Sequence, residues 1–333
     1  MKNIFIHLSA MLILLGQPTE TMAQRKQQQL GRGVVAVNSG SNVTITWRRL
    51  AQDPENAKWN VYARKSGNTE YTLLNQQPLD NTNFKTTSSI VPVGTELAVQ
   101  MIYTHGNETR EGKISDAFIV KKQNLRNIYM EIAFNGSPLK NADVSTKFVW
   151  PADLNGNGEY DYVVDRNSVN SSRHYLEAYL ADGTYLWTID MGPNEWSSTG
   201  QDDQICAYDI DCDGKSEVII QTSDGTRFWD KTKGEWGLYV NGSATGDTDN
   251  DGIIDYTNET KNNAPKYMTI VDGMTGAEKE SVEQQYDDAY NRTNKASLMG
   301  DEYNKHVGHV GIFYHDGIHP AIVMEWHTRT KEG

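Results

Sequence analysis

Residues 153–161 read DLNGNGEYD, with a carboxylate or amide at every second position from the first to the fifth, another carboxylate at the ninth and a glycine at the sixth. The same spacing returns as DIDCDGKSE at residues 209–217 and as DTDNDGIID at residues 247–255. Each stretch places side-chain oxygens at positions 1, 3, 5 and 9, and the glycine permits the bend that lets them converge. The carbonyl at position 7 can add a further oxygen. Three copies in one register predict three ion-binding loops.

The donor set of these loops is typical of calcium sites. All the ligands are hard oxygens without histidine or cysteine, which favours calcium over zinc or copper, and oxygens so close together would repel one another without a cation between them. The predicted ligands are Asp153, Asn155, Asn157, Glu159 and Asp161 in the first loop, Asp209, Asp211, Asp213, Lys215 and Glu217 in the second, and Asp247, Asp249, Asp251, Ile253 and Asp255 in the third, where Glu159, Lys215 and Ile253 act through their carbonyls.

The segments after the loops favour strands over helices. YDYVVD, from residue 160, and SEVIIQTSD, from residue 216, are rich in β-branched residues and alternate apolar with polar side chains. A helix-loop-helix calcium hand or a dockerin repeat needs a helix at that place, so the pattern argues against both. Acidic turns on a solvated surface stay the alternative for any single loop. The ions are expected to brace sheets rather than to take part in chemistry.

The N-terminus and the composition limit the class of protein. Residues 1–23 have an early lysine, a short apolar run and small polar residues at the end, which predicts a secretory signal peptide and an exported protein, periplasmic, on the cell surface or extracellular. No segment is long and apolar enough for a membrane span. A net charge of −13 without a basic cluster argues against nucleic acid. We expect a monomer.

The cysteine content offers no disulfide framework, because only Cys206 and Cys212 occur. The two could pair if their strand and loop meet; otherwise one is a buried thiol and the other a thiol at the loop surface.

Residues 24–125 are predicted to form a β-sandwich of the fibronectin type III or immunoglobulin-like kind. Short alternating segments separated by Ser-Gly, Asp-Pro and Ser-Gly-Asn turns carry this prediction. The segments cover residues 33–37, 43–50, 59–65 and 96–103. We expect Trp47, Trp59 and Tyr62 to pack in the core.

Residues 126–333 are predicted to form the first blades of a β-propeller, because strand-and-loop units of four strands repeat. The first unit has strands at 146–151, 160–166, 175–180 and 185–189, and the second repeats the order at 204–208, 217–222 and 267–271. Trp187 is expected in the blade core. An insertion between the second and third strands of the second unit contains the third acidic loop, and a third unit starts near Val307 and is cut at Gly333.

With these residues in view, the chain resembles the rhamnogalacturonan lyases of polysaccharide lyase family eleven. The resemblance runs through the whole chain and rests on LGRGVVAV (30–37), VTITWRR (43–49), NVY (60–62), DLNGNGEYD, ADGTYLW (181–187), DIDCDGKSEVIIQTSDGT (209–226) and YMTIVDGMTG (267–276). It implies a small β-domain followed by an eight-bladed, calcium-rich propeller. The implied substrate is the pectic polysaccharide rhamnogalacturonan I, an alternating rhamnose and galacturonic acid backbone. The implied reaction is β-elimination, which leaves an unsaturated uronic acid.

β-Elimination needs a group that neutralises the uronate carboxylate and a base that takes the proton at C5. Arg166, Asn167 and Arg173 follow the second strand of the first unit, where a cleft-facing loop is expected, and arginine suits carboxylates. These three and Asp224 are the candidate substrate contacts, although ordinary surface arginines and a turn-forming Asp224 are the alternatives.

The chain departs from the family pattern at cleft positions. Lys147 stands where the family has Asn, Asn167 stands where it has Asp, and Glu325-Trp326-His327 replaces an Arg-Gly-Tyr segment. The catalytic residues stay unknown, and these 333 residues are expected to hold only part of the active site. Two alternatives to a lyase stay open: a polysaccharide-binding protein without activity, and a calcium-braced adhesion propeller.

Overall fold

The computed structural model describes residues 26–120, 133–169, 174–192, 205–223, 225–238, 266–283 and 307–326. All regular structure in these ranges is β-strand, and they contain no helix, so the all-β prediction is confirmed. None of the five sheets closes on itself within the described ranges. Nor do these ranges hold a helix that is long and apolar enough to cross a membrane. The predicted signal peptide, Arg173, Asp224 and the third acidic loop lie outside the described residues.

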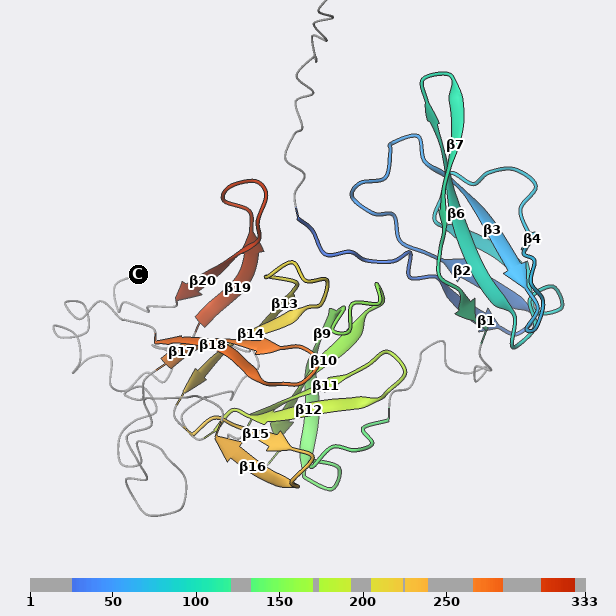
Figure 1. Ribbon diagram of the computed structural model, residues 1–333. Coiled ribbons are helices and arrows are strands. Elements are labelled where there is room, and N and C mark those ends of the chain that lie inside the picture. The colour runs from blue at the N-terminus through green and yellow to red at the C-terminus, as the bar shows by residue number, and fades with distance from the viewer. Residues whose placement is uncertain are drawn as a thin grey trace, which may run out of the picture.

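Two sheets in the first third of the chain share one core (Figure 1). One sheet has the order β1 (Val35–Ser39), β2 (Asn42–Thr46), β5 (Asn83–Thr87), and the other has the order β4 (Thr72–Leu73), β3 (Lys58–Arg64), β6 (Glu96–His105), β7 (Glu108–Ile114), with β8 (Phe118–Ile119) paired to β6. Trp47 and Trp59 are buried there with ring centroids 6.0 Å apart, which confirms their predicted core role. Tyr62 is half-buried, and its hydroxyl donates to Gln100 over 2.9 Å.

Three further sheets follow in the chain. The first has the order β16 (Glu235–Leu238), β15 (Arg227–Asp230), β12 (Tyr185–Asp190), β11 (His174–Tyr179), β10 (Asp161–Ser168), β9 (Val144–Ala152). The second has the order β13 (Ile205–Tyr208), β14 (Glu217–Ser223), β17 (Lys266–Asp272), β18 (Glu278–Glu283), and the third is the hairpin of β19 (Val307–Phe313) and β20 (Ala321–Trp326). The predicted strands of both repeated units are present in the predicted order.

The sheet of the first unit has six strands and not the four that the repeat predicted. Its two extra strands, β15 and β16, come from the start of the insertion in the second unit, and β15 pairs with β12 through Ile189–Phe228 and Asp190–Arg227. The physical reason is that the hairpin occupies backbone groups at the β12 edge that would otherwise lack a partner strand.

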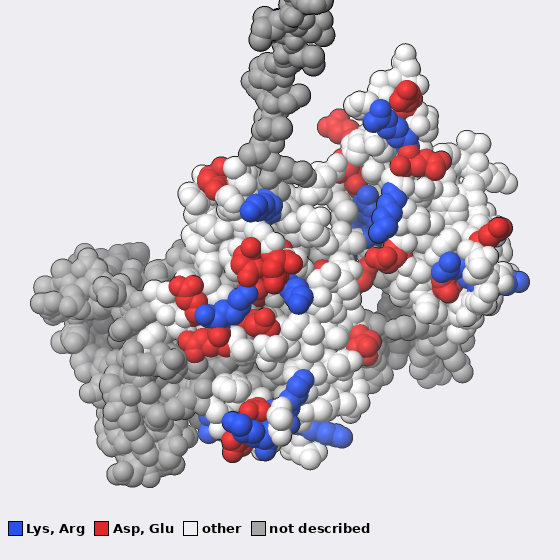
Figure 2. Space-filling model, viewed as in Figure 1, with Lys and Arg blue, Asp and Glu red and all other residues white. Residues whose placement is uncertain are grey.

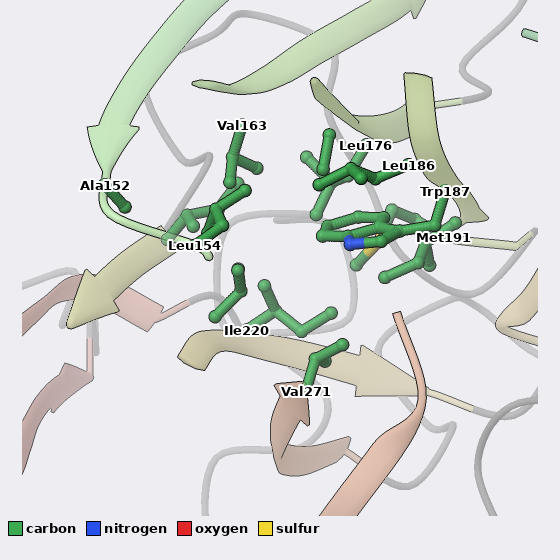
Figure 3. Close-up of a cluster of buried hydrophobic side chains, with 13 residues drawn as sticks. Ala152, Leu154, Val163, Leu176, Leu186, Trp187, Met191, Ile220 and Val271 are labelled. Carbon is green, nitrogen blue, oxygen red and sulfur yellow. The ribbon is translucent and has the colours of Figure 1, made fainter. Parts of the chain in front are cut away.

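Apolar side chains from the first two repeated units meet in one cluster, shown in Figure 3. Val163 and Leu176 extend from the first unit toward Ile220 and Val271 of the second. Trp187 is 2% exposed, and its indole Nε1 donates to the carbonyl of Gly273 over 2.7 Å, which confirms its predicted core position. The two sheets therefore pack face to face and bring the acidic loops at their ends together.

The first strands of the three repeated units are neighbours in space. Strand β13 lies against β9 on one side and against β19 on the other (Figure 1). The β9–β10 and β13–β14 connections, which are the first two acidic loops, consequently start from adjacent strands.

Candidate functional site

The first acidic loop, residues 153–161, closes around two buried carboxylates. Asp153 Oδ1 accepts hydrogen bonds from the amides of Gly156 and Asn157 over 2.8 and 3.1 Å, and its Oδ2 accepts one from Gly158 over 2.7 Å. Asp161 accepts from Leu154 over 3.1 Å through Oδ2 and from Ala181 over 2.9 Å through Oδ1. Both aspartates are at most 1% exposed, so the loop curls inward as the spacing predicts.

The second acidic loop, residues 209–217, has the same curl, with carboxylates at all four of positions 1, 3, 5 and 9. Asp209 Oδ2 accepts from the amide of Gly214 over 3.0 Å, and Glu217 Oε2 accepts from Ile210 over 3.0 Å. Oxygens of Asp209, Asp211 and Glu217 lie within 4.8 Å of one another. Asp209 Oδ1 is buried and has no hydrogen-bond partner among the described residues. A cation among these three carboxylates would satisfy that oxygen.

Backbone conformation explains which residues occupy the loop bends. The sixth position is glycine in both loops, with φ of +85° at Gly158 and +96° at Gly214. The fourth position also has positive φ, +76° at Gly156 and +65° at Cys212, which is the only non-glycine residue with this conformation in the described ranges. Cys206 and Cys212 are both free thiols, and burial raises the pKa of Cys206 to about 11.

Burial also shifts the pKa values of the loop carboxyls. It raises the pKa of Asp153, Asp161, Asp209 and Glu217 above the ordinary values, because the charged form loses solvation, while donating amides oppose the rise. These oxygen donors fit a hard divalent cation, and calcium accepts the number and mixture of carboxylate, amide and carbonyl oxygens that each loop offers. Loop residues 247–255 lie outside the described residues.

The two described loops touch each other. The Ser216 amide donates to the Asp153 carbonyl over 2.8 Å, and a Cβ on Gly156 would lie 3.0 Å from the Gly214 carbonyl oxygen. Acidic side chains gather on the face of the molecule in Figure 2, with lysine and arginine side chains among them. The loops thus form one joint between the first two repeated units.

A segment before β1, which we call the N-terminal arm (residues 26–33), crosses this joint. The Gly31 amide donates to the Gly158 carbonyl over 2.7 Å, and Gln28 Nε2 donates to Ser216 Oγ over 2.6 Å. Arg48 Nη1 donates to the Gly158 carbonyl over 3.1 Å, and its guanidinium lies 4.1 Å from the centre of the Tyr160 ring. These contacts connect the N-terminal sheets to the acidic loops.

The same arm reaches the third repeated unit. The Lys26 amide donates to the Ile318 carbonyl over 2.8 Å, and the Tyr314 hydroxyl donates to the Lys26 carbonyl over 2.8 Å. Tyr314 also shares a hydrogen bond of 2.8 Å with the hydroxyl of Tyr208 in the second unit. Three sheets are therefore held by one extended segment.

Two of the predicted substrate contacts, Arg166 and Asn167, lie at the end of β10 opposite the first acidic loop. Strand β10 continues through Ser168, so Arg166 and Asn167 lie within it and not after it as expected. Asn167 is half-buried and opposes His174 in the β10–β11 pair. Arg166 is 7% exposed, and its Nη1 donates to Glu177 over 2.7 Å. Its role as a sugar contact stays a prediction, as do the roles of Arg173 and Asp224.

A buried polar network surrounds Arg166 and was not predicted. Glu177 is fully buried and accepts hydrogen bonds from Tyr179 over 3.1 Å and from Thr188 over 3.2 Å, and the Ser137 hydroxyl also donates to it. The Arg166 guanidinium stacks 4.1 Å from the centre of the Phe134 ring. The sequence signal that could have revealed this network is the opposite charge of Arg166 and Glu177 on consecutive predicted strands.

A second unpredicted pair lies beside Asn167. His174 Nε2 is 3.3 Å from Asp165 Oδ1, and both residues are buried. Asp165 and Asn167 are two apart in β10 and so share a face of the sheet. Buried Gln221 and Ser223 end β14 of the second unit. The ends of the two units thus carry polar groups where a cleft is expected.

Comparison with known proteins follows the same division of the chain. Residues 139–332 match the model of the C-terminal domain of rhamnogalacturonan lyase family 11, and residues 25–112 match the β-sheet domain of rhamnogalacturonan I lyases. The rhamnogalacturonan endolyase YesW of Bacillus subtilis is 27% identical over 91% of this chain and 46% of its own length. The exolyase YesX of the same organism is 27% identical over 92% of this chain and 48% of its own length.

Solved structures give the same result. A Bacillus licheniformis rhamnogalacturonan lyase matches with a TM-score of 0.62 and 28% identity over 90% of this chain and 48% of its own. The YesW structure matches with a TM-score of 0.63 and 28% identity over the same shares of the two chains. The chain spans about half the length of the relatives that it matches. Since the family model covers more than half of its residues, the chain belongs to rhamnogalacturonan lyase family 11.

Proposed function

We propose that this protein is a lyase that cleaves the rhamnose–galacturonic acid backbone of rhamnogalacturonan I by β-elimination. The observation that carries the proposal is the family match over residues 139–332, and two relatives with the name of rhamnogalacturonan lyase support it. One of them is an endolyase and the other an exolyase, so the proposal covers the bond that is cleaved and not its place along the polymer.

The architecture that we propose is a β-sandwich over residues 24–125 followed by propeller blades from residue 126 onward. The shared core of the first two sheets supports the sandwich. The adjacent positions of β9, β13 and β19 support the propeller, because the first strand of each blade lies next to the central axis of such a fold. The acidic loops would then lie at one end of the blades.

We propose calcium as the metal of the acidic loops, with a bracing role. Asp153 and Asp161 would hold it in the first loop, and Asp209, Asp211 and Glu217 would hold it in the second. The buried, unpartnered Asp209 Oδ1 and the raised pKa values of the buried carboxyls support this assignment, since a cation offsets the cost of burying their charge. The third loop is proposed as a further site on its sequence alone.

The substrate is proposed to lie at the strand ends opposite the acidic loops. Asn167 would contact the sugar chain there, with Arg173 and Asp224 in the neighbouring connections. An arginine that pairs with the uronate carboxylate would make the proton at C5 easier to remove. The pair of Asp165 and His174 would hold the β10 end in position beside Asn167.

We propose that the protein is exported as a monomer after removal of residues 1–23. The support is the sequence pattern of that segment. Sequencing the N-terminus of the protein recovered outside the cytoplasm should give a start at Gln24.

The direct test is incubation of the purified protein with rhamnogalacturonan I and calcium, followed by ultraviolet absorbance of the unsaturated uronate product. Absorbance should rise, and it should not rise with homogalacturonan as the control polymer. Retention of rhamnogalacturonan on a column of immobilised protein without any product would instead favour a binding protein. If neither product nor retention is observed, the adhesion function is the remaining candidate.

A further inference from the structure

We infer that the ammonium group of Lys279 serves as a cation within the second acidic loop, and that it must leave before calcium can bind there. The inference rests on the proposed calcium binding at the loops. It concerns how one residue of this chain sets the calcium affinity of one loop.

The contact geometry places the ammonium among the loop oxygens. Lys279 Nζ lies 2.7 Å from Asp211 Oδ2 and 2.9 Å from Glu217 Oε1. Both acceptors belong to the group of three carboxylates whose oxygens lie within 4.8 Å of one another. The ammonium therefore occupies part of the space that a divalent ion would need.

A bulge in the sheet directs Lys279 to this place. In the pairing of β17 with β18, Ile270 opposes Glu280 and Val271 opposes Glu278, so Lys279 is the extra residue between them. Bulges change the direction in which a side chain extends. Strand β17 pairs in turn with β14, whose first residue is Glu217. The bulge thus aims the lysine at the loop that precedes β14.

The first unit provides a matched comparison. In the pairing of β11 with β12, Ala178 opposes Trp187 and Tyr179 opposes Tyr185, so the extra residue is Leu186. An apolar, buried side chain therefore stands where the second unit has Lys279. The carboxylate at position 9 of that loop belongs to Asp161. It accepts its second hydrogen bond from the Ala181 amide and not from an ammonium group.

The number of carboxylates at positions 1, 3, 5 and 9 of the two loops differs in the same direction. The first loop has the carboxylates Asp153 and Asp161, with amides at positions 3 and 5, whereas all four of these positions are carboxylates in the second loop. Extra negative charge at close range raises the need for a cation. The lysine occurs beside the loop with more carboxylates at its ligand positions, and hydrogen bonding to Asp211 and Glu217 raises the pKa of its ammonium group.

The ammonium group satisfies the loop only in part, so calcium can replace it. Within the part of the chain that the structure describes, Asp209 Oδ1 has no hydrogen-bond partner even with Lys279 in place. The Lys279 side chain is 35% exposed, so its ammonium group can turn toward solvent. A divalent ion that reached Asp209, Asp211 and Glu217 together would gain the contact that the ammonium lacks.

Calcium titration calorimetry of chelator-treated protein tests the inference. Lys279→Met removes the charge and keeps a side chain of similar length. It should tighten calcium binding at the second loop by about tenfold, because one cation no longer competes beside two carboxylates. Lys233→Met is the matched control, since that exposed ammonium group also pairs with two carboxylates, Asp230 and Glu235, but lies outside the acidic loops. It should change the affinity by less than about twofold.

Two more variants keep the result interpretable. Lys279→Arg retains the charge and should leave the affinity near that of the natural protein, which covers the case in which Lys279→Met folds poorly. In an Asp209→Asn background, Lys279→Met should no longer tighten binding, which assigns the effect to the second loop. Calcium binding that Lys279→Met leaves unchanged or weakens overturns the inference. If the natural protein binds no calcium at all, the proposed metal role fails instead.

Discussion

The amide of Ser216 donates a hydrogen bond of 2.8 Å to the carbonyl of Asp153, so the second acidic loop is bonded directly to the first. Each loop belongs to a different sheet, and the apolar cluster between those sheets lies just behind the loops. An ion bound by one loop would consequently stiffen the contact with the other. The bracing role that we propose for calcium depends on this contact.

Calcium removal should lower the melting temperature of the protein. A site held at about 100 times its dissociation constant contributes about 2.7 kcal/mol to stability, so losing even one such site is measurable by calorimetry. Magnesium should restore less than calcium, because it prefers a smaller and more rigid octahedral site. Equal melting temperatures in calcium and in chelator would exclude a bracing role.

The calcium effect should depend on pH in a defined direction. Burial raises the pKa of Asp153, Asp161, Asp209 and Glu217. In the metal-free protein their contribution to stability is therefore complete below the ordinary carboxyl value of about 4, and it is lost as the pH rises through the raised values. Bound calcium offsets that loss of stability at neutral pH, because it neutralises the charge of the buried carboxylates. The difference in melting temperature with and without calcium should shrink from pH 7 toward pH ~4, and a constant difference would contradict this.

Cys212→Gly should stabilise the protein. A side chain at φ +65° costs about 1–2 kcal/mol, which glycine avoids. Glycine in turn loses more conformational entropy on folding, and this reduces the gain by about 0.5–1 kcal/mol. A net gain of roughly 0.5–1 kcal/mol is expected in urea unfolding. Cys212→Ala keeps the Cβ atom and should gain nothing, so an equal gain from both variants would point to loss of the thiol instead.

Gly158→Ala should weaken the contact between the N-terminal arm and the first loop. A Cβ there would lie 2.7 Å from the Gly31 amide nitrogen, and φ is +85°. Gly214→Ala is the matched control, since φ is +96° but no atom lies within 4 Å of the added Cβ. Gly158→Ala should cost about 1 kcal/mol more in urea unfolding, the value of the lost hydrogen bond. Equal costs would mean that the arm contact adds no stability.

Arg166→Met should destabilise the protein by about 3–5 kcal/mol, because it leaves the carboxylate of fully buried Glu177 without its ion-pair partner. Changing Glu177 to Met as well should recover much of that loss in urea unfolding. If Arg166 instead serves mainly as a sugar contact, the single variant would keep its stability and lose affinity for rhamnogalacturonan.

The sequence predicted the features that depend on local pattern. Alternation in YDYVVD and SEVIIQTS predicted β10 and β14, and the spacing of oxygens and glycines predicted the curl of the loops before them. Features that depend on tertiary contacts do not follow from the local sequence pattern. The β15–β16 hairpin joins the sheet of the first unit because β12 offers an unpaired edge. The sequence of residues 227–238 does not indicate that β12 is the partner strand.

The unpredicted parts of the site have the same cause. Lys279 reaches the second loop only because a bulge shifts its register, and the Arg166 side chain pairs with Glu177 on the neighbouring strand β11. The sequence predicts Arg166 in a cleft-facing loop because the predicted strand ends there, whereas β10 runs on to Ser168. Sequence patterns fix neither bulges nor the last residues of strands.

The most direct test of the account is a crystal grown with calcium and measured for anomalous scattering at a wavelength where calcium contributes. The account predicts a peak inside loop 153–161 beside Asp153 and Asp161, and another inside loop 209–217 with Lys279 turned to solvent. Loops without peaks, in crystals soaked at saturating calcium, would contradict the proposal that these oxygens hold metal and brace the sheets.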